Sequence, residues 1–445
     1  MVYCRFSQPN LRNHDMDILL SALSGIRTGL CPIGLVIVAA LFTYRICDET
    51  GAMAKIRRAL SSVSSDPVVL MLLVVWGFGN FMEGIAGFGT AVAIPAAILY
   101  GFGMDGVKAI GICLIGNTIA TGYGAVGVPM VTLAKTANLD TQELTAVATQ
   151  LLAAGMLPIP FLLVAFQEGW RKLPKYLPVC LVAALAMAVP CFFIARTMGP
   201  ELPAVLGGLL TMAAIAVFRP RGAGGEKSGV SARELLVAAA PFLGVVVLLS
   251  LYALALPKAV KAQVTPGAVI LAGALCGALV QRVPARTMGR VALASLKQAK
   301  RALVTICLIL AVAKMLETVG AISFLAELVV KVFGKGYAFL ATAVGVCGGA
   351  LTGSGTNSCV LFGALQRDAA ASLGFDPKVF AGANILGAGI GKMICPQSLA
   401  IGLAACGLAG CEGKVLRRVM PYFVAVVAAA CAFAGLVALL RPQAA

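Results

Sequence analysis

Long apolar stretches separated by short polar loops run through almost the whole chain of 445 residues. Because about 20 apolar residues cross a bilayer as one helix, the pattern predicts an all-α, polytopic membrane protein with about ten to thirteen spans. A further short window, residues 320–333, carries Glu327 and Lys331 and could lie at the membrane interface instead. The thirteen main windows are residues 28–47, 67–82, 106–120, 143–166, 176–195, 201–218, 234–256, 266–281, 302–319, 336–351, 380–394, 396–410 and 420–440.

The polar stretches suggest how the chain is divided. Residues 1–27 are predicted to form a polar N-terminal segment, and residues 28–218 a first membrane half. Residues 219–233, rich in Gly and charge, are predicted to be a linker to a second half, residues 234–445. Residues 1–16 lack the apolar core and cleavage site of a signal peptide, so the first span is expected to serve as the targeting signal.

Composition agrees with a membrane protein. Hydrophobic residues make up 60% of the chain and charged residues 12%, with a mean hydropathy of +0.96, beyond what a soluble core needs. The net charge of +17 could suggest nucleic acid. However, the basic residues gather in short loops between spans, which is the bias that orients membrane proteins. We therefore expect a lipid bilayer, and no nucleic acid, as a partner.

One pattern of residues occurs twice with identical spacing, and each copy follows a Gly-x-Gly-Thr. Small residues at helix contacts would explain the recurring Gly better than the recurring Asn and Pro. In membrane chains, Gly and Pro interruptions at matching places in two halves point to a transporter's binding site. The copies are Asn117, Gly122, Gly124 and Pro129, then Asn384, Gly389, Gly391 and Pro396; the preceding motifs are Gly87, Gly89 and Thr90, then Gly353, Gly355 and Thr356.

These interruptions predict two structural repeats. The repeats have opposite orientations in the membrane, and are therefore inverted, if an odd number of membrane crossings separates them. Each repeat has one re-entrant hairpin, at 84–103 and 353–374, and one broken transmembrane helix, at 106–134 and 380–410. Non-helical backbone at membrane depth is tolerated only where protein or a water-filled cavity satisfies it. The polar hairpin turns are therefore expected to line a cavity.

Such a cavity would suit an anion, because the N-termini of half-helices offer free N–H groups and a positive dipole end. Pro129 and Pro396 suit the first turn of a half-helix.

Lys392 interrupts an apolar stretch, where an unpaired cation costs about 2.5 to 3.5 kcal/mol. Its partner is either a substrate carboxylate or Glu83. Glu83 is in turn either a proton carrier, if burial raises its pKa, or an interfacial anchor.

Other polar residues near the interruptions are candidates for binding the rest of a substrate. Asn117 and Asn384 could bind a hydroxyl or carboxylate, or satisfy carbonyls freed by the breaks. Tyr123 offers a phenolic donor or simply packs. The remaining candidates are Thr90, Ser354, Thr356, Asn357, Ser358, Gln397 and Ser398.

Most catalytic and cofactor chemistry lacks the residues it needs. His14 is the single histidine, no Cys-x-x-Cys pair occurs among 14 cysteines, and residues 387–392 fail the phosphate-loop pattern. We expect no cofactor, no metal and no catalytic residues. An integral membrane enzyme acting on a lipid would need an acidic metal-binding cluster or a His/Asp pair, and both are scarce in this sequence. A passive channel would conduct without accumulating solute, whereas the repeated broken helices favour a transporter.

Around the hairpin turns and the helix breaks, the sequence resembles the lactate permease family. The resemblance extends from about residue 20 to about residue 425. The matching stretches are Glu83–Ile94, Cys113–Pro129, Leu351–Gln366 and Gly391–Ile401. The resemblance implies a proton-coupled symporter of L-lactate, with D-lactate and glycolate as related substrates, in the bacterial inner membrane. It also implies kinship with an ion transporter superfamily whose members are often homodimers with inverted repeats and an elevator-like movement.

The chain departs from the family pattern in three places. Family members usually carry about two more N-terminal spans. In the second hairpin turn, Gly355 replaces a common acidic residue and Cys359 replaces an Asn, and the stretch after Asn117 lacks the usual proline. The loss of the acidic residue leaves Glu83 as the candidate for proton coupling. Within the transporter class, the alternative is a sodium-coupled carrier of another small organic anion such as a dicarboxylate, which would favour a second cation beside Lys392.

Overall fold

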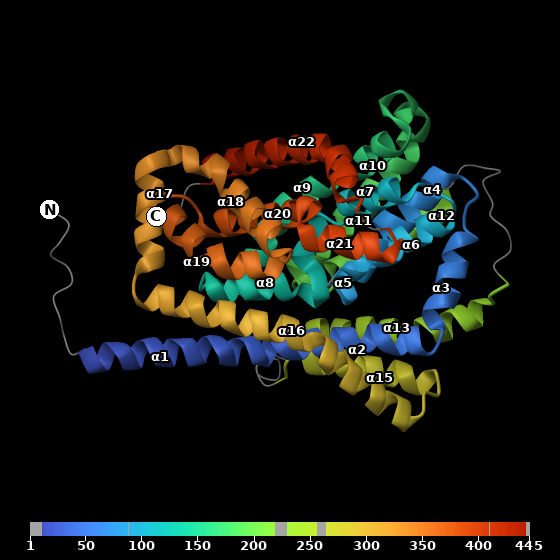
Figure 1. Ribbon diagram of the computed structural model, residues 1–445, viewed down its shortest axis with the longest axis horizontal. Coiled ribbons are helices and arrows are strands. Elements are labelled where there is room, and N and C mark those ends of the chain that lie inside the picture. The colour runs from blue at the N-terminus through green and yellow to red at the C-terminus, as the bar shows by residue number, and fades with distance from the viewer. Residues whose placement is uncertain (1–10, 88, 219–228, 256–263, 409, 442–445) are drawn as a thin grey trace.

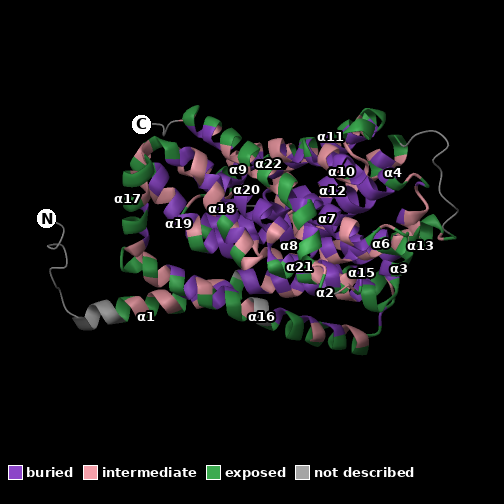
Figure 2. Ribbon diagram, turned by 45° about the horizontal axis from the view of Figure 1, so that its top comes forward, coloured by how far each residue is buried: buried purple, intermediate pink, exposed green. Residues whose placement is uncertain are grey.

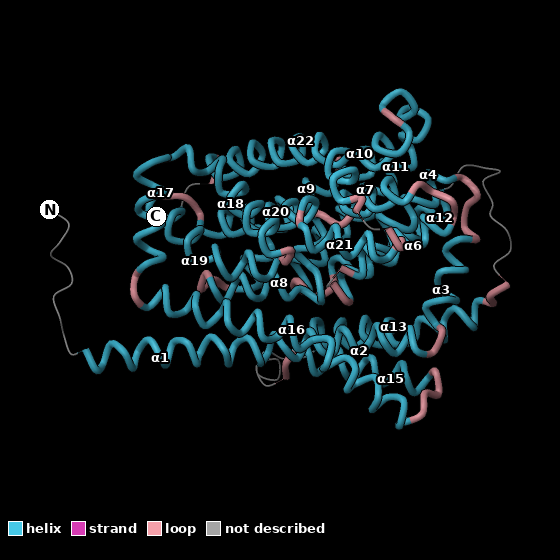
Figure 3. Tube along the Cα trace, in the orientation of Figure 1, coloured by secondary structure: helices cyan, strands magenta, loops and turns pink. Residues whose placement is uncertain are grey.

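The computed structural model describes residues 11–87, 89–218, 229–255, 264–408 and 410–441, and the regular elements in these ranges are helices, drawn in cyan in Figure 3 and labelled in Figure 1. Within these ranges seven helices are long and apolar enough to cross a membrane, or up to nine if each of two bent pairs counts as one span. This is fewer than predicted, because adjacent windows prove to be the halves of bent spans and several apolar helices are short. The short helices are Thr90–Gly101, Pro203–Phe218 and Pro266–Val280.

One side of the molecule is an outer layer of helices, which Figure 1 shows along its lower edge. The layer is held together by an apolar core that also includes residues of neighbouring helices, with Ile37, Val245 and Ile270 fully buried. It consists of α1 (Leu11–Thr28), η1 (Gly29–Gly34), α2 (Leu35–Glu49), α3 (Ala52–Ser61), α13 (Ala232–Ala255), α15 (Pro266–Val280) and α16 (Ala285–Thr318).

The remaining helices form a central bundle, and α17 (Ala321–Phe333) with η5 (Gly334–Gly336) connects α16 to it. Figure 2 shows that buried residues are concentrated in this bundle. Its first part is α4 (Pro67–Met71), η2 (Leu72–Gly79), α5 (Asn80–Ile85), α6 (Thr90–Gly101), α7 (Gly106–Gly116), η3 (Ile119–Tyr123), α8 (Gly124–Thr136), α9 (Thr141–Met156), α10 (Ile159–Glu168), η4 (Trp170–Lys172), α11 (Leu173–Met198) and α12 (Pro203–Phe218). Its second part is α18 (Tyr337–Thr352), α19 (Gly355–Leu373), α20 (Pro377–Gly391), η6 (Lys392–Ile394), α21 (Pro396–Ala405) and α22 (Glu412–Leu439).

The first span begins earlier than predicted. Residues Leu11–Thr28 form α1, and the candidate span runs from Met16 to Glu49. The apolar residues Met16, Leu19, Leu20 and Leu23 lie in the part predicted to be a polar segment. Most of the predicted linker, residues 219–228, lies outside the described residues, and α13 already begins at Ala232.

Two helical hairpins have their turns at the start of the predicted segments, not in their middle. The first turn falls between α5 and α6, so its incoming arm is the buried span Pro67–Ile85. The second falls at Gly353 and Ser354, between α18 and α19. The sequence missed the incoming arms because they are uninterrupted apolar stretches, which look like ordinary spans.

Each hairpin is followed by a bent pair of helices. The first pair, Gly106–Gly116 with Ile119–Thr136, bends by 55°, and the second, Pro377–Ile394 with Pro396–Ala405, bends by 50°. The order of hairpin and bent pair thus occurs twice along the chain. An inverted relation between the two copies stays a prediction.

Small residues pack the second bent helix against its hairpin. A Cβ added to Gly345 or Gly349 of α18 would collide with the backbone of α20, and a Cβ on Gly387 or Gly391 of α20 would collide with the backbone of α18. Close approach of this kind is how membrane helices associate without a hydrophobic driving force. It places the break of α20 directly beside the turn of the hairpin.

Candidate functional site

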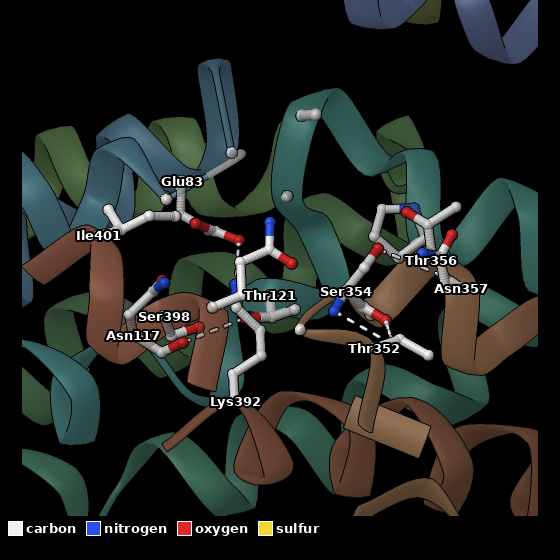
Figure 4. Close-up of a pocket in the computed structure, with 18 of the residues that line it drawn as sticks. Glu83, Asn117, Thr121, Thr352, Ser354, Thr356, Asn357, Lys392, Ser398 and Ile401 are labelled. Carbon is white, nitrogen blue, oxygen red and sulfur yellow. Dashed lines mark hydrogen bonds and ion pairs between the residues drawn. The ribbon is translucent and has the colours of Figure 1, made fainter. Parts of the chain in front are cut away.

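The hairpin turns and the helix breaks surround one polar cavity of ≈ 350 Å³ (Figure 4). The wall on the far side comes from the outer layer, with Leu41 of α2 and Gln298 and Thr305 of α16. The cavity therefore lies between the central bundle and the outer layer. A site of this size is large enough for a small solute and the water around it.

The first break is a stretch of strained backbone. Asn117 is the C-terminal cap of α7, and after η3 the residues Ala125, Val126 and Gly127 adopt left-handed conformations with φ of 43°, 57° and 76°. Such a φ is a genuine outlier for β-branched Val126. A strained conformation costs on the order of 1 to 3 kcal/mol for each non-glycine residue and persists only where the surrounding structure enforces it. Such conformations are common at binding sites. Pro129 follows in the first turn of the resumed helix.

The second break is built differently. One turn of 3₁₀-helix, Lys392–Ile394, is followed by Cys395 in an extended conformation, and Pro396 opens α21. Because proline lacks the N–H that would be free there, it suits this first turn. The side chains of Gln397 and Ser398 line the cavity beside this helix start.

A buried ion pair inside the cavity joins the first hairpin to the second helix break. Lys392 Nζ lies 3.0 Å from Glu83 Oε1 and 3.0 Å from Thr121 Oγ1, and the Thr121 hydroxyl donates to the carbonyl of Asn117 at 3.1 Å. The pair connects the end of the first hairpin's incoming arm to the second break. Gly124 makes room for it, since a Cβ there would lie 2.8 Å from Glu83 Oε1.

The ion pair is nearly dry. The Glu83 side chain is 3% exposed and the Lys392 side chain 10%. Breaking such a pair by removing one partner typically costs about 3 to 5 kcal/mol, because a charge is left buried and uncompensated. Of the two partners expected for Lys392, the structure contains Glu83. Glu83 and Lys392 are the charged residues among the described residues of the cavity wall, so their charges sum to zero.

Several buried polar atoms at the cavity have no hydrogen-bond partner among the described residues. They are both side-chain amide atoms of Asn117, Oε2 of Glu83 and Oδ1 of Asn357. Buried polar groups are normally satisfied, and each exception calls for an explanation. Since all three residues line the cavity, these atoms are available to a polar solute.

Most of the predicted binding residues come together in the cavity wall, and Figure 4 shows several of them pointing inward. Thr121, Thr352, Gln298 and Thr305 also line it and were missed. Thr121 lies inside the repeated pattern and could have been found there, whereas nothing in the sequence marks α16 as part of the site. The predicted residues in the wall are Glu83, Gly87, Gly89, Asn117, Gly124, Pro129, Gly353, Ser354, Gly355, Thr356, Asn357, Lys392, Gln397 and Ser398.

Four predicted binding residues lie outside the cavity wall, and three of them make structural hydrogen bonds. The Thr90 hydroxyl donates to Gly87 at 2.8 Å at the start of α6. The Tyr123 hydroxyl donates to Thr149 at 2.7 Å, and the Ser358 hydroxyl donates to Gly345 at 3.3 Å.

Asn384 is fully buried behind the cavity, against α18. Four predicted helix-break residues, Gly122, Gly389, Gly391 and Pro396, also lie outside the wall. Of these, Gly389 lets the two breaks touch, because a Cβ there would collide with the carbonyl of Thr118.

The fold and the site together define a class of protein. Candidate membrane spans that are broken beside a polar cavity, with half-helix ends at the cavity, are the arrangement that secondary transporters use. The sequence model of the family described as L-lactate permease matches residues 12–265 and 257–441. The chain belongs to this family, and it is a multi-pass permease of the bacterial inner membrane.

Similar proteins agree with this assignment. The chain is 34% identical to an L-lactate permease of Streptococcus iniae, over 81% of this chain and 82% of that one. It is 30% identical to an L-lactate permease of Bacillus subtilis, over 90% and 83% of the two chains. It is also 30% identical to the glycolate permease GlcA of Escherichia coli, over 88% and 82%.

Two solved structures share the fold. One is MtrF of Neisseria gonorrhoeae, described as one of a class of antimetabolite efflux pumps, with a TM-score of 0.54 and 15% identity over 96% of this chain and 85% of that one. The other is the YdaH transporter of Alcanivorax borkumensis, with a TM-score of 0.54 and 16% identity over 95% and 88%. At this identity the likeness concerns architecture alone.

Proposed function

We propose that this protein takes up L-lactate and related short 2-hydroxy monocarboxylates, such as D-lactate and glycolate, together with a proton. The names of its relatives support the substrate class, since they include L-lactate and glycolate permeases. The observation that carries the coupling is the buried pair between Lys392 and Glu83 in the cavity wall.

The coupling follows from charge balance. While Glu83 is ionised, its carboxylate forms an ion pair with the Lys392 ammonium and the two charges cancel. A substrate anion that entered then would leave one net negative charge in a nearly dry site, which is costly. If Glu83 binds a proton, it releases Lys392, and the substrate carboxylate takes its place. The site is neutral in both states, so one anion travels with one proton.

The polar atoms without partners suit the rest of such a substrate. The Asn117 amide offers both a donor and an acceptor, and Asn357 Oδ1 can accept from a hydroxyl. Together with Lys392 they would hold a carboxylate and a neighbouring hydroxyl. A dicarboxylate would need a second cation, and Lys392 is the basic residue among the described residues of the wall.

Uptake of labelled L-lactate into proteoliposomes tests this proposal. With an inward proton gradient the wild type should accumulate lactate above the outside concentration, and collapsing the gradient should abolish accumulation while leaving exchange. Accumulation driven equally well by a sodium gradient without a proton gradient would contradict proton coupling. Absence of lactate uptake, with uptake of a dicarboxylate instead, would contradict the substrate class.

A further inference from the structure

An apolar groove of ≈ 520 Å³ runs along the outer face of the outer layer, between the first helix and α16. It is separate from the transport cavity and shares none of its lining residues. Two lysines close one end of the groove. Its walls are Ile26 and Leu30 on one side and Leu296, Leu303, Val304, Cys307 and Leu308 on the other.

Close helix contact forms the floor of the groove. A Cβ on Gly25 would lie 2.5 Å from the carbonyl oxygen of Leu310, and one on Gly29 would lie 2.8 Å from Cys307 Sγ. The large side chains are therefore turned outward around this contact. Leu30 is 55% exposed and Leu308 is 59% exposed, and on a membrane protein such a surface faces lipid or another chain.

Lys297 and Lys300 form the charged end of the groove. Both are exposed, and neither ammonium has a partner among the described residues. Along α16 they follow Arg290, which pairs with Glu49 at 2.6 Å, by 7 and 10 residues, or about 10 to 15 Å. Gln298, which accepts from Arg45 at 2.7 Å, lies between them.

The Glu49 end of the outer layer belongs at the membrane surface, and the two lysines lie within side-chain reach of it. The span Met16–Glu49 has 34 residues, which corresponds to about 51 Å of helix against about 30 Å of hydrocarbon. Even with the break at Cys31, this length exceeds the hydrocarbon, and the end that carries Arg45, Asp48 and Glu49 is placed at the level of the lipid headgroups. Lysine side chains at this depth extend their ammonium groups toward the interface.

We propose that this groove binds one anionic phospholipid. Its phosphate would lie between Lys297 and Lys300, and one acyl chain would run along Leu30, Val304 and Leu308. Basic residues beside an apolar surface near the headgroups are the features that recruit anionic lipids. A second copy of this chain packed through the same face by twofold symmetry would place lysines of both copies on one buried surface, which charge repulsion disfavours.

The groove also lies over a break in the first helix. Within η1, Cys31 has an extended backbone conformation, with φ of −142° and ψ of 121°, and Leu30 precedes it in the groove wall. A bound acyl chain would pack against this break in the helix. Lipid binding should therefore raise the thermal stability of the protein.

The test is native mass spectrometry of the purified full-length protein, titrated with phosphatidylglycerol or phosphatidylcholine. The wild type should bind one phosphatidylglycerol much more tightly than phosphatidylcholine. Replacing both lysines, Lys297→Gln with Lys300→Gln, should weaken phosphatidylglycerol binding by about thirty-fold, roughly fivefold for each lysine. Thermal unfolding should show phosphatidylglycerol stabilising the wild type and not this variant.

A matched control removes the same charge elsewhere. Lys331→Gln with Lys335→Gln changes two exposed lysines outside the groove and should leave phosphatidylglycerol binding unchanged. Val304→Trp should fill the groove and weaken binding with both lysines present. Equal binding of the two lipids, or equal loss in both lysine double variants, would overturn the proposal. A disulfide between two copies that forms efficiently in a Leu308→Cys variant in membranes, and not in the wild type with its native Cys31 and Cys307, would assign the groove to a second copy instead.

Discussion

Replacing Glu83 with Gln should remove the pH dependence of anion binding. The glutamine mimics the protonated carboxyl in shape and charge, so Lys392 is free for substrate at every pH. In the wild type the two carboxylates compete for one ammonium. Opposite charges 3.0 Å apart attract with about 5.5 kcal/mol at an effective dielectric constant of about 20. A substrate that displaced an ionised Glu83 would leave that carboxylate buried and unpaired, which is costly.

The magnitude follows from proton linkage. Where Glu83 is ionised before substrate binds, each bound anion takes up one proton, and the wild-type Kd should rise tenfold for each pH unit, about 1.4 kcal/mol. The Glu83→Gln variant should show a slope of zero. At the alkaline end of the range it should therefore bind lactate at least tenfold more tightly than the wild type.

Equilibrium binding of labelled L-lactate to purified protein, from about pH 6 to about pH 8, measures both slopes. Glu327→Gln is the matched control, because Glu327 is an exposed acid outside the cavity, and it should keep the wild-type slope. A tenfold change per pH unit retained in Glu83→Gln would refute the proton role of Glu83. A flat wild-type profile would refute the charge balance itself.

The Glu83→Gln substitution should also change the stability of the protein. Without Glu83 the Lys392 ammonium is buried and unpaired, which should lower stability by about 3 to 5 kcal/mol. Saturating lactate supplies the missing charge and should raise the Tm of Glu83→Gln more than that of the wild type. Equal stabilisation of both proteins by lactate would show that the anion does not bind at Lys392.

Other consequences can be checked with the same preparations. Lys392→Gln should raise the Kd for lactate at least a hundredfold, because it removes the cation of the site; an unchanged Kd in binding assays would exclude that role. Thr121→Val, which removes a hydroxyl 3.0 Å from Lys392 Nζ, should weaken uptake about tenfold, and Thr121→Ser should restore it. Wild-type uptake should not respond to an imposed membrane potential, because one anion and one proton carry no net charge, and a potential-dependent rate would indicate another stoichiometry. Val126→Gly should raise Tm by relieving the strain at φ of 57°, and a lower Tm would show that the side chain contributes more than the strain costs.

Local features of the sequence were enough to predict much of the architecture. Uninterrupted apolar stretches indicated membrane helices, because a backbone in lipid must satisfy its own hydrogen bonds. The recurring Gly, Asn and Pro residues located both helix breaks and both hairpin turns, since these residues act on the backbone within a few positions. The resemblance to lactate permeases is confirmed by the family match. The proton coupling and the binding roles of individual residues stay predictions.

The tertiary structure decided which residues meet. Glu83 and Lys392 are 309 positions apart, and both stood out in the sequence, yet only the packing of one hairpin arm against the opposite break makes them a pair. Gln298 and Thr305 come from a helix with no interruption, so no local signal marked them. Asn117 and Asn384 occupy equivalent places in the repeated pattern, but one lines the cavity and the other is buried behind it. The sequence determines local backbone preferences, whereas long-range packing determines which charges face each other and which polar groups reach the cavity.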